Sequence, residues 1–150
     1  MKPGELFFHW EHIRKGLIST INAFTEEDFG YVLYPGSWTV GRIMLHIAGA
    51  EDYWLRYVVT RELKEWPENY TLENYPDKES ILQVLSEVHT RTTEYLGTLT
   101  EDDLSAIVKT PWESELPLLW IIWHVVEHEI HHRGELSLIL GTLGREGLDV

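Results

Sequence analysis

Residues 123–140 read WHVVEHEIHHRGELSLIL and predict a long helix with four histidines in little more than two turns. Residues four apart on a helix lie one above the other, so His128 and His132 can direct two imidazoles at one ion. Imidazole is a common metal ligand, and this pattern suits zinc or nickel first, with iron or manganese as alternatives. A third ligand is needed, and His46, in LHIAGAEDYW, is the obvious candidate. The sequence therefore predicts a three-histidine metal site.

The spacing of apolar residues predicts four helices, at about residues 6–24, 40–63, 78–96 and 117–143. Pro117 suits a first helical turn, and Gly141 and Gly144 indicate a helix end. Thr100 is a candidate cap for a short turn in the connection 100–115. No segment shows the alternation of a convincing strand. These helices each need a partner for one apolar face, so we expect an all-α four-helix bundle formed by residues 1–150 as one domain.

The histidines of the last helix lie at different depths. A rotation of about 100° per residue places His132 near the centre of the buried face and His128 near its edge. His124, one turn earlier, could line the site or replace a ligand, whereas His131 falls at the rim or on the surface. On the second helix, His46 lies at the border of the buried face.

Two glutamates, Glu51 and Glu129, fall in the buried sectors of their helices. A buried carboxylate is costly unless it is paired or lies near a cation. We expect these two to orient a ligating histidine or to accept a proton, and we name them with His124 as candidate catalytic residues. His89 has no histidine neighbours and is expected to be structural or exposed. The seven tryptophans are expected mainly in the core.

The composition excludes several classes of function. A formal charge of -13 with no basic run opposes binding to nucleic acid and to acidic membrane surfaces. The absence of cysteine excludes disulfides, thiolate nucleophiles and Cys-based zinc sites. The first residues carry charge where a signal peptide needs an apolar stretch, and no apolar run is long enough to span a bilayer. We therefore expect a cytoplasmic protein.

Residues 128–132 also satisfy the H-E-x-x-H pattern of zinc proteases, in which the glutamate is the general base. The pattern is short, and the metzincin extension fails because Leu138 stands where a third histidine belongs. Only eighteen residues follow His132, and no strand is available to hold a peptide substrate. We therefore disfavour proteolysis.

A weak internal echo links FTEEDF and the segment after it to LTEDDL and its successor. In this alignment His46 matches His124, and Glu51 matches Glu129. A duplicated helical hairpin and shared capping chemistry explain the echo equally well.

The chain resembles the DinB/YfiT-like family of metal-dependent enzymes in INAFTEEDF, PGSWTVGRIMLHIAGAEDYW and HVVEHEIHHRGELSLILGTLG. The resemblance implies a four-helix bundle with an up-down-down-up order and a divalent metal on His46, His128 and His132. The wider family is similar to thiol-dependent enzymes, including bacillithiol S-transferases and mycothiol-dependent maleylpyruvate isomerase. Glu135 departs from the family pattern, since many relatives have Gln after H-R-G.

These observations lead to two hypotheses about function. The first is a transferase or hydrolase that acts on a small molecule, with a low-molecular-weight thiol as a possible co-substrate. The second is a non-catalytic metal- or ligand-binding module that acts through dimerisation. An open coordination position favours the enzyme and a filled one the binder. In either case we expect a homodimer.

Overall fold

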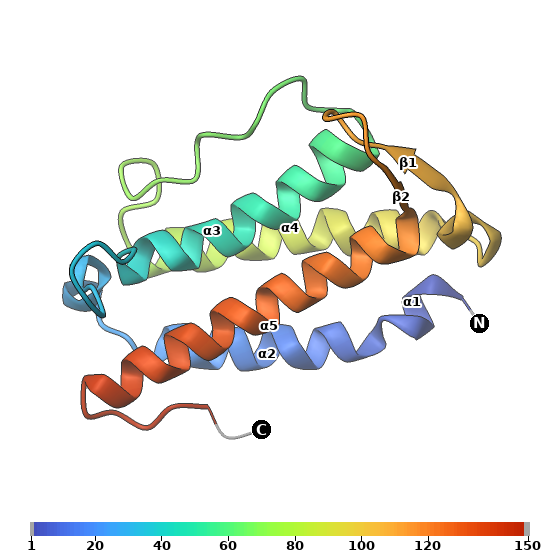
Figure 1. The fold of residues 1–150 in the computed structure, drawn as a ribbon. Coiled ribbons are helices and arrows are strands. Elements are labelled where there is room, and N and C mark those ends of the chain that lie inside the picture. The colour runs from blue at the N-terminus through green and yellow to red at the C-terminus, as the bar shows by residue number, and fades with distance from the viewer. Residues whose placement is uncertain (1, 149–150) are drawn as a thin grey trace.

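Four long helices form the body of the protein (Figure 1) in a computed structural model that describes residues 2–148. They are α2 (Phe8–Asn22), α3 (Val40–Asp52), α4 (Lys78–Thr98) and α5 (Leu118–Thr142). Along the bundle, α3 and α4 run in one direction, whereas α2 and α5 run in the other (Figure 1). The predicted four-helix bundle and its up-down-down-up order are therefore confirmed. No helix among the described residues combines the length and apolarity needed to cross a membrane.

Because α3 and α4 are parallel, the chain must return along the bundle between them. Residues 60–77 make this return beside α3 (Figure 1). Two glycines of α3 allow the close approach: a Cβ at Gly41 would lie 2.8 Å from the Leu72 side chain, and one at Gly49 would lie 3.1 Å from Tyr70. The Tyr70 hydroxyl also donates a hydrogen bond of 2.7 Å to Asp52. The returning connection is thus held against the helix that carries His46.

The helix boundaries differ from the predicted ones in several places. A short helix, α1 (Pro3–Leu6), precedes α2, and α3 continues into a π-helical segment, η2 (Tyr53–Val59), so the second helix ends before residue 63. The N–H of Thr60 bonds to Leu55, and Arg61 has a φ of 60° that helical continuation does not allow. The last helix ends at Thr142, and Gly144 follows its C-cap with a φ of 73°, whereas Gly141 lies inside α5.

The connection 100–115 contains strands that the sequence did not predict. β1 (Ile107–Lys109) and β2 (Glu115–Pro117) form an antiparallel hairpin with Val108 opposite Leu116. Three-residue strands are too short to show an alternating pattern. Pro117 closes β2 and caps α5 instead of lying in its first turn.

The weak internal echo has a structural counterpart in two short 3-10 helices, η1 (Glu26–Gly30) and η3 (Asp102–Ser105). Asp28 accepts hydrogen bonds from the backbone N–H and the hydroxyl of Thr25, and Asp103 accepts the same pair from Thr100. The predicted cap is displaced by one residue, because the N-cap position of η3 is occupied by Glu101 and not by Thr100.

Buried apolar side chains fill two clusters along the bundle. One lies between the second half of α2, α3, the first half of α4 and the end of α5, and the other joins the beginnings of α2 and α5 with η2 and the end of α4. The expectation that tryptophans fill the core is wrong for most of them. Trp10 is buried, but the exposed fraction is 46–50% at four others, which are Trp66, Trp112, Trp120 and Trp123.

Candidate metal centre

Three histidines from two helices converge at one point. His46 comes from α3, and His128 and His132 come from α5, which packs against α3. One ring nitrogen from each residue can be chosen so that all three lie within 4.8 Å of one another. The Nε2 atoms of His46 and His128 are 2.9 Å apart. The structure therefore brings together the three residues that the sequence singled out.

The protonation of these rings fits a cation site. Burial and the neighbouring His132 lower the pKa of His46 to about 4, and burial with the same neighbour lowers the pKa of His128 to about 3. Both rings are therefore neutral at pH 7 and keep a nitrogen lone pair for a metal ion. Together with His132 they form a set of three imidazoles that zinc and nickel accept as ligands. The chemistry of the three side chains thus fits a divalent ion.

Glu135 fixes the orientation of the third histidine. Nδ1 of His132 lies 2.7 Å from Oε2 of Glu135, one turn along α5. A carboxylate oxygen accepts hydrogen bonds, so Nδ1 of His132 donates this one, and the contact fixes the orientation of the ring. No role was predicted for Glu135, although its spacing of three residues from His132 is the signal that indicates this contact. His131, His132 and Glu135 also form a second group with metal-ligand spacing.

An aromatic side chain and a cavity border the three histidines. The Trp38 ring packs edge-on against His46 at 4.6 Å between centroids and lies nearly parallel to His132 at 6.3 Å. A cavity of about 630 Å³ lies between α3 and the returning connection, and His46 is part of its wall. A small molecule in this cavity would therefore have access to the histidine group.

His124 lies apart from the group of three. Its ring stacks on Trp120 with centroids 5.0 Å apart and meets Trp54 edge-on at 4.9 Å. These contacts place it in an aromatic cluster one turn of α5 before His128. His131 is exposed, as the sequence predicted. A catalytic role for His124 stays a prediction.

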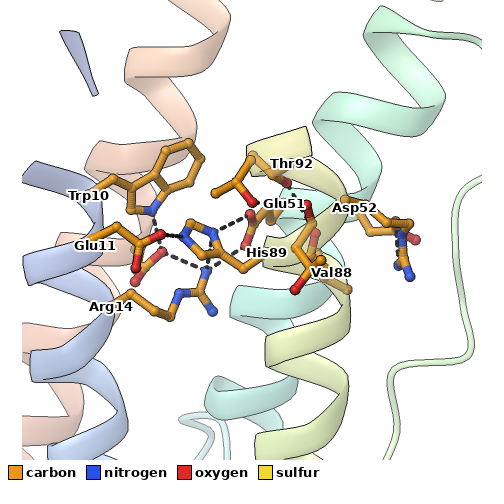
Figure 2. A network of polar contacts seen from close by, with 12 residues as sticks. Trp10, Glu11, Arg14, Glu51, Asp52, Val88, His89 and Thr92 are labelled. Carbon is orange, nitrogen blue, oxygen red and sulfur yellow. Dashed lines mark hydrogen bonds and ion pairs between the residues drawn. The ribbon is translucent and has the colours of Figure 1, made fainter. Parts of the chain in front are cut away.

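The two buried glutamates meet a cation, but that cation is an arginine. Figure 2 shows Arg14 of α2 beside Glu51 of α3, and Arg14 also pairs with Glu129, which belongs to α5. The Arg14 guanidinium lies 2.5 Å from Glu51 and 2.8 Å from Glu129. Trp10 donates a further hydrogen bond of 2.7 Å to Glu129. His89 of α4 completes the network at 2.9 Å from Glu51.

The contacts of these two glutamates differ from the contacts that we expected for them. Among the described residues, neither Glu51 nor Glu129 hydrogen-bonds to any of the three clustered histidines. Each of the four long helices instead contributes to one buried set of charges around Arg14. His89 is buried in this set. Of the two alternatives predicted for this residue, structural or exposed, the structural one applies. The proposed proton-accepting role of the glutamates stays a prediction.

The two carboxylates differ in electrostatic environment. Burial raises the pKa of Glu51, but the charge of Arg14 and the hydrogen bond from His89 outweigh it and hold that pKa at about 2. Burial raises the pKa of Glu129, and the charge of Glu51 adds to this effect against the opposing charge of Arg14. Glu51 therefore stays ionised beside Arg14.

Comparison with known proteins identifies relatives of this fold. The sequence profile of the DinB superfamily matches residues 9–136. A DinB-like protein from Bacillus cereus shares 20% identity with a TM-score of 0.77, over 96% of this chain and 94% of the other. The DinB-like protein YjoA from Bacillus subtilis shares 16% identity with a TM-score of 0.76, over 97% and 96%.

YfiT from Bacillus subtilis is also similar, with 22% identity and a TM-score of 0.66 over 93% of this chain and 87% of the other. That protein is described as a probable metal-dependent hydrolase with an unusual four-helix bundle topology. None of the curated proteins searched matches the chain significantly.

Proposed function

The chain belongs to the DinB superfamily, and from this premise we propose that it is a metal-dependent hydrolase or transferase that acts on a small molecule. His46, His128 and His132 would hold a divalent ion, with zinc or nickel as the first candidates. The observation that carries this proposal is the convergence of three imidazoles beside a cavity. The description of YfiT as a probable metal-dependent hydrolase supports the same class of activity.

The side chains around the site have different roles. Glu135 holds the His132 ring by a hydrogen bond, and Trp38 packs against the His46 ring. A bound divalent ion would supply Lewis-acid chemistry and lower the pKa of a water or thiol. Arg14 pairs with both buried glutamates of the bundle core, and among the described residues neither glutamate belongs to a group with metal-ligand spacing. This arrangement supports an open position of the kind that catalytic sites keep.

A low-molecular-weight thiol is the co-substrate that we propose for the transferase form of the reaction. The chain has no cysteine, so a thiolate would have to come from a second molecule. A metal favours the thiolate form of a small thiol, which is the form that attacks an electrophile. The hydrolase form would use water in the same place.

The second candidate is a non-catalytic module that binds metal and acts as a homodimer. It is favoured by apolar side chains that α5 exposes, with 47% of Trp123, 42% of Ile130 and 61% of Leu138 accessible. Light scattering after gel filtration tests this alternative. A dimer that binds metal but shows no thiol- or water-dependent chemistry would favour the module over the enzyme.

Metal titration tests the proposed site directly. Protein purified without a nickel column and stripped with chelator should bind one equivalent of zinc in calorimetry. His46→Ala or His128→Ala should abolish this stoichiometric binding, whereas the exposed His131→Ala should not. The contrast matters because His132 belongs to two candidate groups. Loss of binding in His131→Ala with retention in His46→Ala would move the site to the second group.

Cobalt substitution tests for an open position. A cobalt-loaded protein should change its visible spectrum on addition of a small thiol, with a charge-transfer band from sulfur to metal. An unchanged spectrum at saturating thiol, together with four protein ligands in X-ray absorption, would overturn the proposed enzyme and leave a closed binding site.

A further inference from the structure

The cavity beside His46 has walls of two kinds. One wall comes from α3 and the residue before its cap, and includes Trp38 and Arg42. The other wall is the returning connection, which contributes Trp66 and Leu72 among others. Most of this lining is apolar or aromatic, as in sites that bind small organic molecules.

Arg42 is a cation of the cavity that has no carboxylate partner among the described residues. Its guanidinium lies over the Trp38 ring, 4.3 Å from the centroid. Four other arginines pair with carboxylates, and these are Arg14, Arg56, Arg91 and Arg145. In a chain with a formal charge of -13, an arginine held by an aromatic ring and left without a counter-charge is available for an anion from outside.

The helix places this cation and the histidine group in a fixed relation. Arg42 and His46 are four residues apart on α3, so both project from the same side of the helix. One turn separates them, which corresponds to about 6 Å along the axis. A molecule in the cavity can therefore reach both at once if its two polar ends are about one helical turn apart.

We propose that Arg42 positions the substrate by binding its carboxylate, while the reacting group lies about one helical turn away at the three histidines. The part of the inference that concerns the reacting group rests on the proposed function. The substrate class is then a small organic acid with an apolar middle that packs against Trp66 and Leu72. Glu68 lines the same cavity, and its charge disfavours an anion at that wall, which leaves the Arg42 wall for the carboxylate.

The geometry of an arginine suits this role better than that of a lysine. A guanidinium presents parallel N–H groups that bind both oxygens of a carboxylate, and it stacks on an aromatic face. The contact with Trp38 limits the positions that the Arg42 side chain can take, so less freedom is lost when an anion binds. Arg42→Lys should therefore restore binding only in part.

Two probes of the same shape test the proposal: 3-phenylpropanoate and its neutral amide, 3-phenylpropanamide. Binding to the metal-free protein is measured by calorimetry, so that the carboxylate cannot gain affinity by coordinating a metal. We expect the acid to bind at least about tenfold more tightly than the amide, as charge-assisted hydrogen bonds allow. Arg42→Gln should remove this preference, and Lys15→Gln, an exposed charge on α2, should leave it intact.

The outcomes separate this inference from the proposed function. If wild-type protein binds zinc at one equivalent but the acid and amide bind equally, Arg42 is not an anion site and the metal proposal stands. If zinc does not bind and the acid preference still depends on Arg42, the anion site stands and the metal proposal falls. If Arg42→Gln keeps the preference of the wild type while its circular dichroism and zinc stoichiometry are unchanged, the inference is overturned.

Discussion

The carboxylate of Glu135 holds Nδ1 of His132 at 2.7 Å, so a glutamate outside the histidine group sets the direction of one of its rings. Removing such a partner typically lowers metal affinity by about 10- to 100-fold. We expect Glu135→Ala to weaken zinc binding by about this factor in calorimetry. Glu135→Gln should retain most of the affinity, because an amide oxygen also accepts the hydrogen bond.

The matched control is Glu127→Ala on the same helix, where the side chain is 81% exposed. This change alters the charge near the site to the same extent without touching His132. Equal losses in Glu135→Ala and Glu127→Ala would show that charge, and not the hydrogen bond, determines the affinity.

Two glycine substitutions should change stability in opposite directions. Gly41→Ala would place a Cβ 2.8 Å from Leu72 and so push the returning connection away from α3. Overpacking of this kind costs about 1–3 kcal/mol. Gly134→Ala in α5 meets no atom within 4 Å, and the helix should gain about 0.5–1 kcal/mol.

Urea unfolding of the metal-free protein measures both changes. The returning connection forms one wall of the cavity, so Gly41→Ala should also weaken binding of 3-phenylpropanoate. An unchanged midpoint for Gly41→Ala would show that Leu72 moves aside without cost, and that the connection is not held against α3 by close packing.

The helices and the histidine group were predictable because each depends on local spacing. The pair His128 and His132 is separated by one helical turn, and the burial of His132 follows from its position on the apolar stripe of α5. The third histidine could not be identified from spacing along one helix, because the approach of α3 to α5 is a tertiary contact. There the family resemblance and the face analysis agreed on His46.

The environment of the glutamates was not predictable from spacing along one helix. Glu51 and Glu129 were recognised as buried, and both are, with exposed fractions of 1% and 2%. Their partner, Arg14, lies on a third helix and has no sequence motif that links it to either. The choice between a histidine and an arginine as the partner depends on how the helices are packed, which apolar periodicity does not specify. The expected homodimer and cytoplasmic location stay predictions.

The neutral histidines should make the metal-free protein sensitive to acid. The pKa of His128 is about 3 in the folded protein, against an ordinary value of 6.5. Between these values the unfolded chain binds a proton that the native state does not, so the free energy of unfolding falls as the pH decreases. The low pKa of Glu51, about 2 against 4.5, further decreases the free energy of unfolding below pH 4.5.

Thermal unfolding between pH 7 and pH 4 measures this dependence. His128→Gln removes one titrating group and should make the decrease in Tm shallower, whereas the exposed His9→Gln should follow the wild type. Parallel curves for wild type and His128→Gln would contradict the depressed pKa of His128.

The buried charges around Arg14 predict an unequal cost of neutralising the two glutamates. Arg14→Met leaves at least one buried carboxylate without its cation, and breaking a buried pair in this way costs about 3–5 kcal/mol. Glu51→Gln should approach that cost, since it removes the carboxylate that stays ionised and faces both Arg14 and His89. Glu129→Gln should cost less, because burial and the Glu51 charge already raise the pKa of Glu129. Urea unfolding at pH 7 gives the order, with Glu127→Gln as the exposed control. If Glu129→Gln proves the more damaging, Glu129 contributes more than Glu51 to the pairing with Arg14, and the expected order is wrong.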